Sequence, residues 1–423
     1  MWRTRLGVSA KALLVAALAA AAASVVGPPA SSEDITPPIG QKGVYYVADF
    51  GAKGDGVTDD TAAFQKALDA AAKDGGGIVF VPTGEFLIKG HLNVPMHVTL
   101  EGMLRSPGTL GSFKGSKLLA VEGRGSEKGE PFIFLNSAAT VKGLIIYYPE
   151  QDRKKPVPYP WCIAGAEYDC SVIDVMMVNP WNGINFGMRG NGRHMIRNVY
   201  GQPLNIGIFV DHCFDVGRIQ NVHFWPFWEG ELMKYTQENS TAFKFVRTDW
   251  QYVDNCFCIC YKVGFQFSNG ASGPGNAVIS NSGADGCPTA VLVEKVQPHA
   301  GVSFVNCQFM GVAVVTETNT GPVKLANCGF WGGKGPYLDL KGLGTVTVTG
   351  CHFNKHPGDD PVIRADCRRL NVSGCDFMDD GKTQVELGPH VYGATIVGNN
   401  LRGGAKVVNN TKEGKVEIGL NSE

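Results

Sequence analysis

The stretches "SFVNCQF" (303–309), "KLANCGF" (324–330), "TVTGCHF" (347–353) and "NVSGCDF" (371–377) repeat one pattern: Asn or Gly, then Cys, then Phe two residues later. Their cysteines are 21, 23 and 24 residues apart. Weaker copies occur at 171–177, 195–201, 218–224, 252–258 and 395–401. A repeat of this length with β-type alternation predicts one coil of a parallel β-helix, with three strands in each coil.

One face of every repeat should lie in a shared core, because a single coil cannot bury its inner face alone. The residues after the Asn or Gly position form the expected inner ladder, which comprises Val175, Val199, Val222, Cys256, Cys307, Cys328, Cys351 and Cys375. A second ladder, two residues further on, comprises Phe224, Phe309, Phe330, Phe353 and Phe377. Since free cysteine packs as a small hydrophobe, we expect most of the 12 cysteines to be reduced and buried.

The segment "DFGAKGDGVTDDTAAFQKALDAA" (49–71) predicts turns at its glycines, followed by a short helix. Thr58 or Asp59 can cap this helix, and Phe64 and Leu68 lie on its apolar face. Strands follow in "GGGIVFVPTGEFLIKGHLNVPMHVTLEG" (75–102). We expect the helix to cover one end of the β-helix and to shield its open strand edges.

These residues resemble the opening of the pectin-lyase-like superfamily. They are most similar to the rhamnogalacturonase/epimerase-type pectate lyase domain, which also occurs in polygalacturonase-related glycoside hydrolases and phage tailspikes. The matching residues are Asp49-Phe50-Gly51-Ala52, Gly54-Asp55-Gly56, Thr58-Asp59-Asp60-Thr61, Gly76-Gly77 and Val81-Pro82. The resemblance implies an all-β, single-stranded, right-handed parallel β-helix with an N-terminal capping α-helix, and a carbohydrate-active protein. It leaves the reaction open, because the catalytic patterns of polygalacturonases and the calcium-binding acids of pectate lyases have no counterpart here.

The N-terminus predicts export. Arg3, Arg5 and Lys11 precede or adjoin the apolar run "ALLVAALAAAAASVV" (12–26), so residues 1–27 are expected to be a signal peptide, with an uncleaved anchor as the alternative. Residues 28–42 should form a flexible leader, and residues 43–423 the β-helix, with the capping segment and first coils at 43–102. The expected location is secreted, periplasmic or at the cell surface, without membrane association after cleavage.

The net charge of −1 gives no support to nucleic-acid binding, which requires a basic surface. The sequence leaves open whether the protein is a monomer or a homotrimer.

Two insertions interrupt the repeat register. Counted from the Asn or Gly position, the repeats at Gly143, Asp174, Asn198, Asn221 and Asn255 are 31, 24, 23 and 34 residues apart. The two long intervals place insertions at 149–161 and 225–240, and both leave the coil at the same corner.

Strand alternation then predicts the outward positions: Ile145, Met176, Tyr200 and His223 before this corner, and Asn185, Phe209, Lys244 and Gln266 after it.

Aromatic and amide side chains around this corner predict a sugar-binding cleft, because aromatic faces stack on sugar rings and amides bind hydroxyl groups. The candidate substrate-binding residues are Tyr148, Trp161, Trp181, Asn185, Tyr200, Gln202, Trp225, Trp228 and Lys244. For each tryptophan, the alternative is packing of the loops onto the coil.

Glycoside hydrolysis needs one protonated and one ionised carboxyl group on opposite sides of the scissile bond. The candidate catalytic residues are Asp211, Glu150, Glu229 and His223. The alternatives are that Asp211 caps a turn and that His223 is a surface histidine.

The sequence therefore predicts a polysaccharide-degrading enzyme, preferably a glycoside hydrolase acting on an acidic or plant- or algal-type polymer. The alternatives are a polysaccharide lyase and a non-catalytic glycan-binding or structural β-helix. No metal site or cofactor is expected, except calcium if the protein is a lyase.

Overall fold

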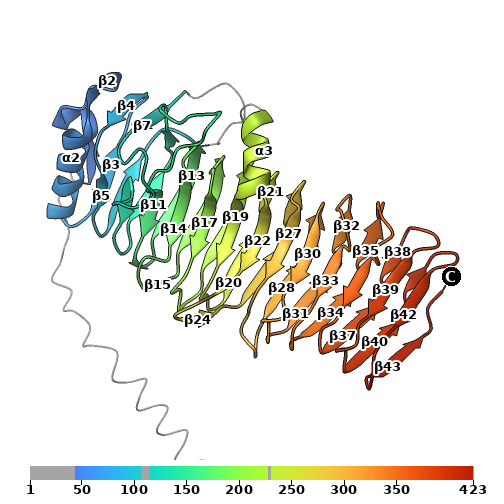
Figure 1. Ribbon diagram of the computed structural model, residues 1–423. Coiled ribbons are helices and arrows are strands. Elements are labelled where there is room, and N and C mark those ends of the chain that lie inside the picture. Colours follow the sequence, from blue (N-terminus) through green and yellow to red (C-terminus); the bar gives the residue numbers. More distant parts are fainter. Residues whose placement is uncertain (1–42, 106–113, 227–229, 423) are drawn as a thin grey trace, which may run out of the picture. The chain divides into compact units, whose positions relative to one another are not determined.

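The computed structural model describes residues 43–105, 114–226 and 230–422. The expected signal peptide and leader lie outside the described residues. From Gly43 onward the chain forms a parallel β-solenoid of about 14 turns (Figure 1), which confirms the predicted β-helix. One face of it is a 13-stranded parallel sheet. Among the described residues, no helix has the length and apolar character that a membrane crossing requires.

A complete coil has a first strand, a second strand and a third strand, and equivalent strands of neighbouring coils pair in parallel. The first strands are β1 (Val44–Tyr46), β3 (Gly77–Phe80), β6 (Val98–Glu101), β9 (Thr140–Lys142), β20 (Gln251–Asp254), β25 (Ala277–Ser280), β28 (Val302–Val305), β31 (Val323–Ala326), β34 (Thr345–Thr349), β37 (Arg369–Ser373), β40 (Gly393–Val397) and β43 (Lys415–Gly419). The second strands are β2 (Asp55–Asp59), β4 (Gly84–Ile88), β7 (Ser116–Ala120), β10 (Ile145–Tyr147), β21 (Phe257–Ile259), β26 (Gly283–Asp285), β29 (Gln308–Phe309), β32 (Gly329–Trp331), β35 (His352–Asn354), β38 (Asp376–Phe377) and β41 (Asn400–Leu401). Three longer strands serve as first and second strand together: β13 (Ser171–Val178), β16 (Met195–Gly201) and β18 (Arg218–Phe224).

The third strands build the 13-stranded sheet, which we call the third-strand sheet. They are β5 (Leu92–Val94), β8 (Ile133–Leu135), β11 (Trp161–Gly165), β14 (Asn182–Phe186), β17 (Ile206–Val210), β19 (Thr241–Phe245), β22 (Val263–Phe267), β27 (Thr289–Val293), β30 (Val312–Val315), β33 (Leu338–Leu340), β36 (Ile363–Ala365), β39 (Thr383–Leu387) and β42 (Lys406–Asn409). Two short pairs lie outside these ladders, β12 (Glu167–Tyr168) with β15 (Asn191–Gly192) and β23 (Asn269–Gly270) with β24 (Gly273–Pro274).

The Asn or Gly of the repeat is the residue at which the chain bends between first and second strand. It has a left-handed backbone, with φ of 57° at Asn198, 55° at Asn306 and 62° at Gly350. Glycine adopts this conformation without a steric cost, and asparagine tolerates it better than most residues. The asparagines also bond one another along the solenoid: Asn221 Nδ2 donates to Asn198 Oδ1 at 2.9 Å. Backbone geometry therefore explains why this position alternates between these two residue types.

The core confirms both predicted ladders, since every residue assigned to them is at most 1% exposed. All 12 cysteines are free and buried, as expected for most of them. The sulfur atoms of Cys258 and Cys287 lie 4.0 Å apart, which is a packing contact and not a disulfide.

A helix lies where the sequence predicts the N-terminal cap. Helix α2 (Thr61–Lys73) buries Phe64 and Leu68 against the first coils. Its N-cap residue is Asp60, one position later than expected, and the Asp60 carboxylate accepts hydrogen bonds from Lys53 N and Gly54 N. The Asp59 carboxylate accepts hydrogen bonds from Thr61 N and Thr61 Oγ1. These acids fasten turns, as the sequence suggested.

Candidate functional site

Three insertions leave the solenoid at the corner between second and third strands. The two predicted ones follow β10 and β18, and the second contains helix α3 (Gly230–Asn239), at the solenoid's edge in Figure 1. A third, residues 121–132 between β7 and β8, was not predicted, because no repeat was recognised upstream of Gly143. It packs on the first: Gly125 N donates to Pro158 O at 2.8 Å. Between the insertions, the corners after β13 and β16 are only 179–181 and 202–205.

Tyr148 does not face outward, which corrects its sequence-based assignment to substrate binding. Its ring is 2% exposed and packs edge-on against Phe132 and Tyr159, with centroids 6.3 and 5.0 Å away. Burial raises the pKa of Tyr148 well above its ordinary value. The residue belongs to the core because strand alternation, continued past Ile146, points its side chain into the solenoid.

Trp161, Asn185 and Lys244 lie on the outer side of the third-strand sheet. Trp161 stacks on Phe209, with centroids 6.0 Å apart and 29° between the ring planes. Strand β14, which carries Asn185, lies between the strands of Trp161 and Phe209, and Asn185 is therefore only 6% exposed. Its Oδ1 has no hydrogen-bond partner among the described residues. Lys244 is half-buried in the same row as Asn185 and Phe209. These three predicted residues therefore lie on one face of the sheet, spread over four successive strands.

Asp211 lies at the opposite edge of this sheet from the corner. Its Oδ1 accepts hydrogen bonds from His212 N at 2.7 Å and Arg247 N at 3.0 Å, and the residue is 8% exposed. Five residues of strand separate it from Ile206, or roughly 17 Å, which exceeds the separation of catalytic carboxyl pairs. Asp211 therefore fastens a turn, as in the alternative raised from sequence, and does not meet acids at the corner.

Glu150 lies in an insertion at the corner and faces water. Its side chain is 55% exposed, and its carboxylate lies 3.9 Å from Arg124 Nε. This exposure does not favour the protonated form that a general acid needs. Trp228 and Glu229, two of the predicted residues of the α3 insertion, lie outside the described residues.

Four rings gather on the outer side of the second strands. The imidazole of His223 lies 5.5 Å from the ring of Tyr200, 5.7 Å from Trp225 and 5.1 Å from Phe257, measured between centroids. Trp225 is 36% exposed, and the other three are half-buried. We call these four residues the aromatic strip. It unites three predicted residues with Phe257, which sequence reasoning missed, although its register opposite His223 could have identified it.

The strip ends on its N-terminal side in a small apolar cluster. Ile145 and Met176 point away from the solenoid interior, as predicted, but they are 0% and 2% exposed. They pack with Val178, and Leu104 and Tyr200 lie against them. The outward face is therefore covered at Ile145 and Met176, whereas the rings of the aromatic strip are partly exposed.

His223 is neutral near pH 7, because burial lowers its pKa below the ordinary histidine value. Its Nε2 is enclosed and has no hydrogen-bond partner among the described residues. Beside it, Gln202 is 1% exposed, and both of its amide atoms lack a partner there too. The side-chain amide of Asn179 and the indole nitrogen of Trp181, at the neighbouring corner 179–181, also have no hydrogen-bond partner among the described residues. Because buried polar atoms normally have hydrogen-bond partners, these unpaired atoms are suited to bind water or a ligand.

A polar hollow adjoins the aromatic strip across the bend residues. It has a volume of about 510 Å³, and its lining includes Arg197, the amides of Gln220 and Asn221, and two carboxylates. These carboxylates already accept hydrogen bonds, Asp174 from Asn198 Nδ2 and Asp254 from Ser280 Oγ. Arg197 is exposed and makes no ion pair with any residue that the structure describes. We call the strip and this hollow together the bend face. Its aromatic rings suit a ring-shaped ligand, and Arg197 is the one cation in the lining of the hollow that can bind a carboxylate.

No group of three or more His, Cys, Asp or Glu side chains in the described ranges is arranged to hold a metal ion.

Residues 45–150 match the family model described as rhamnogalacturonase A/epimerase, pectate lyase-like, which confirms the resemblance. Alginate lyase 7 of Azotobacter vinelandii is 63% identical over 46 residues, or 11% of this chain and 5% of that protein. Mannuronan C5-epimerase AlgE5 of the same organism is 61% identical over 46 residues, with the same coverage. The match therefore spans about one twentieth of these relatives' length.

The solved structure of the mannuronan C-5 epimerase AlgE6 A-module from Azotobacter vinelandii is similar over almost the whole solenoid. The TM-score is 0.54 at 17% identity, and the alignment covers 89% of this chain and 98% of that chain. At this identity the likeness demonstrates the fold alone.

Proposed function

We propose that this pectin-lyase-like β-helix protein is a secreted enzyme that acts on an acidic polysaccharide at the bend face. The observation that carries the proposal is the neutral, ring-enclosed His223 on the face that also carries Arg197, which pairs with Gln220, three positions before His223. The similarity of its N-terminal segment to an alginate lyase and a mannuronan epimerase supports a uronate polymer as substrate.

The aromatic strip would bind the polymer through its sugar faces. The exposed ring of Trp225 and the half-buried ring of Tyr200 offer apolar surface next to His223. Stacking on such rings fixes the plane of a sugar without fixing which sugar it is. The guanidinium group of Arg197 would then select uronate units through charge-assisted hydrogen bonds to the carboxylate.

The arrangement favours removal of the proton next to that carboxylate. A neutral imidazole can accept this proton, and its lowered pKa keeps it in the accepting form at neutral pH. Arg197 would stabilise the negative charge that develops on the carboxylate. The electron pair left on carbon can expel the neighbouring glycosidic oxygen, as in a lyase, or recapture a proton from the other side, as in an epimerase.

Hydrolysis, the reaction preferred from sequence, receives less support from the described residues. It needs two facing carboxyl groups, and Asp211 and Glu150 are separated and differently engaged. Lyase-type or epimerase-type chemistry is therefore the proposed reaction.

The test is incubation of the purified protein with polyuronates and with their carboxyl-reduced, neutral counterparts. Unsaturated ends, or an altered sugar configuration by NMR, are expected with polyuronates alone. A parallel incubation with a chelator tests for a calcium requirement. New reducing ends without unsaturation would indicate a hydrolase, and binding without any product would reject the enzyme proposal.

The decisive variants are His223→Gln and Arg197→Gln, each expected to lower activity by at least 100-fold. Lys324→Gln is the matched control, because Lys324 is an exposed cation on the outer side of β31, outside the bend face. Equal activity of all three variants would contradict the roles assigned to His223 and Arg197.

A further inference from the structure

The C-terminal coils carry a second hollow, on the edge where third strands turn into first strands. Its volume is about 670 Å³, and its lining includes Glu317, Lys341, Leu343, Arg368, His390 and Tyr392. These residues come from four successive coils, in the turns after β30, β33, β36 and β39.

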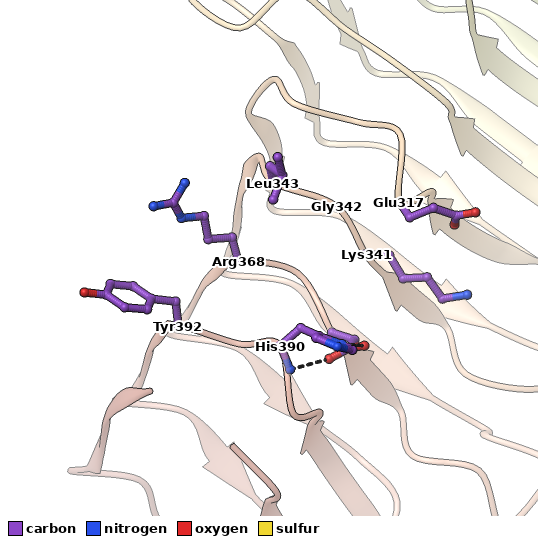
Figure 2. A pocket seen from close by; sticks show the side chains of 8 residues that line it. Glu317, Lys341, Gly342, Leu343, Arg368, His390 and Tyr392 are labelled. Carbon is purple, nitrogen blue, oxygen red and sulfur yellow. Dashed lines mark hydrogen bonds and ion pairs between the residues drawn. The ribbon is translucent and has the colours of Figure 1, made fainter. Parts of the chain in front are cut away.

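Tyr392 is the centre of this surface. Its side chain is 58% exposed, and it also lines two adjoining hollows of about 490 and 210 Å³. The guanidinium carbons of Arg368 and Arg369 lie 5.8 and 5.6 Å from its ring centroid. Figure 2 shows Tyr392 and Arg368 extending to the same side, with Glu317 and Lys341 across the hollow. An exposed ring is thus held beside two cations.

The charges around the hollow favour an anion. Asp366 is already engaged by His390, whose Nδ1 lies 2.7 Å from Asp366 Oδ2 and whose backbone N donates to Asp366 Oδ1. Lys341, Arg368 and Arg369 form no ion pair with any residue that the structure describes. Glu317 is the one other carboxylate among the lining residues. In this hollow two unpaired cations, Lys341 and Arg368, therefore face a single unpaired carboxylate, whereas the adjoining hollow holds Arg369 and Lys415 together with Glu413 and Glu417.

We infer that this surface is a second binding site, separate from the bend face, for uronate-containing oligosaccharides. The ring of Tyr392 and the exposed side chain of Leu343, 62% accessible, offer apolar contact to sugar rings. Arg368 and Lys341 offer partners for carboxylates spaced along the chain. The adjoining hollows extend the surface beyond one sugar unit. Such a site would hold a long polymer on the protein, whatever happens at the bend face.

The inference is tested by calorimetric titration with a purified uronic acid tetramer and with the same tetramer after carboxyl reduction. Wild-type protein should bind two equivalents of the acidic tetramer and lose affinity for it as salt rises. Tyr392→Ala and Arg368→Gln should each raise the dissociation constant of one site by at least ten-fold. Tyr392→Phe should stay within two-fold, because no hydrogen bond of the Tyr392 hydroxyl occurs among the described residues.

Arg197→Gln separates this inference from the proposed function. If Arg197→Gln loses one bound equivalent of the tetramer and Tyr392→Ala loses the other, the bend face and the second site are both supported. Loss of all binding in Arg197→Gln, with Tyr392→Ala unaffected, overturns the second site. Loss of all binding in Tyr392→Ala, with Arg197→Gln unaffected, supports the second site and rejects the bend face. Equal binding of the acidic and the reduced tetramer overturns the role given to the cations.

Discussion

The imidazole of His223 meets the ring of Phe257 edge-on, with centroids 5.1 Å apart and 83° between the planes. The two residues are direct partners in the parallel pairing of β18 with β21, although α3 lies between those strands in the sequence. The insertion therefore leaves the register of the coil intact. Phe257 thus belongs to the surroundings whose burial lowers the pKa of His223.

Phe257→Ala should raise the pKa of His223 toward the ordinary histidine value, because removing the ring admits water. Histidine NMR titration of wild-type and variant protein measures this shift. If His223 is the base, the acid limb of the pH–activity profile should move to higher pH with it. Phe257→Leu keeps most of the apolar cover, so it should shift the pKa of His223 and the acid limb of the profile by less. An unchanged His223 titration in Phe257→Ala would show that other groups set its pKa.

Trp225→Ala should weaken polyuronate binding roughly five- to ten-fold, in keeping with about 1 kcal/mol for an aromatic contact. Its exposed position predicts little effect on the melting temperature. Fluorescence titration with a polyuronate measures the affinity. The control is Trp250→Ala, since Trp250 is 63% exposed at the other end of the third strands. An equal loss of affinity in both variants would argue against a specific site at Trp225.

The cysteines should resist thiol reagents until the protein unfolds. All 12 are buried and free, and burial raises the pKa of Cys162 and of Cys367 to about 12. Maleimide labelling followed by mass spectrometry should give almost no adducts on native protein at pH 8 and 12 adducts in denaturant. Fewer adducts in denaturant without a reductant would reveal disulfides and contradict the free ladder.

Asn306→Ala should lower the free energy of unfolding by about 1–2 kcal/mol, because alanine is disfavoured at φ of 55°. It also removes the hydrogen bond from Asn306 Nδ2 to Asn281 Oδ1 at 3.4 Å. Asn306→Gly should cost less, since Gly350 holds the same bend with φ of 62°. Urea unfolding of the three proteins tests this order, and an alanine variant as stable as the glycine variant would contradict it.

His194 should make the protein sensitive to mild acid. Its pKa is lowered to about 4 by burial, so the unfolded chain binds more protons than the folded chain between about pH 6.5 and 4. The free energy of unfolding should therefore fall by about 3 kcal/mol as the pH drops through this window. Urea unfolding at several pH values measures the slope. His194→Gln should flatten it, whereas the exposed control His299→Gln should keep it.

Much of the fold could be read from the sequence because the repeat has a local physical cause. Each coil needs a residue that tolerates the bend, then a small apolar residue, then a ring, and these demands recur at Asn327, Cys328 and Phe330. Less of the candidate site could be predicted from the sequence. His223 and Trp225 were found from alternation, but Phe257 and the insertion at 121–132 were not.

The errors have a shared origin. Alternation assigns a side chain to the inside or the outside of a coil, but it does not say what covers the outside. Met176 points outward and is still buried, because Ile145 and Val178 pack around it. Asp211 was expected to face substrate, but two backbone N–H groups donate hydrogen bonds to its carboxylate.

The sequence by itself determined the coil, its bend, its core ladders and its cap, since these depend on residues close together in the chain or repeated at a fixed interval. The tertiary structure alone decided which outward residues meet: His223 with Phe257, Trp161 with Phe209, and Tyr392 with two arginines. Stacking of coils brings together residues that are distant along the chain, and the lengths of the insertions decide which of them water or a ligand can reach.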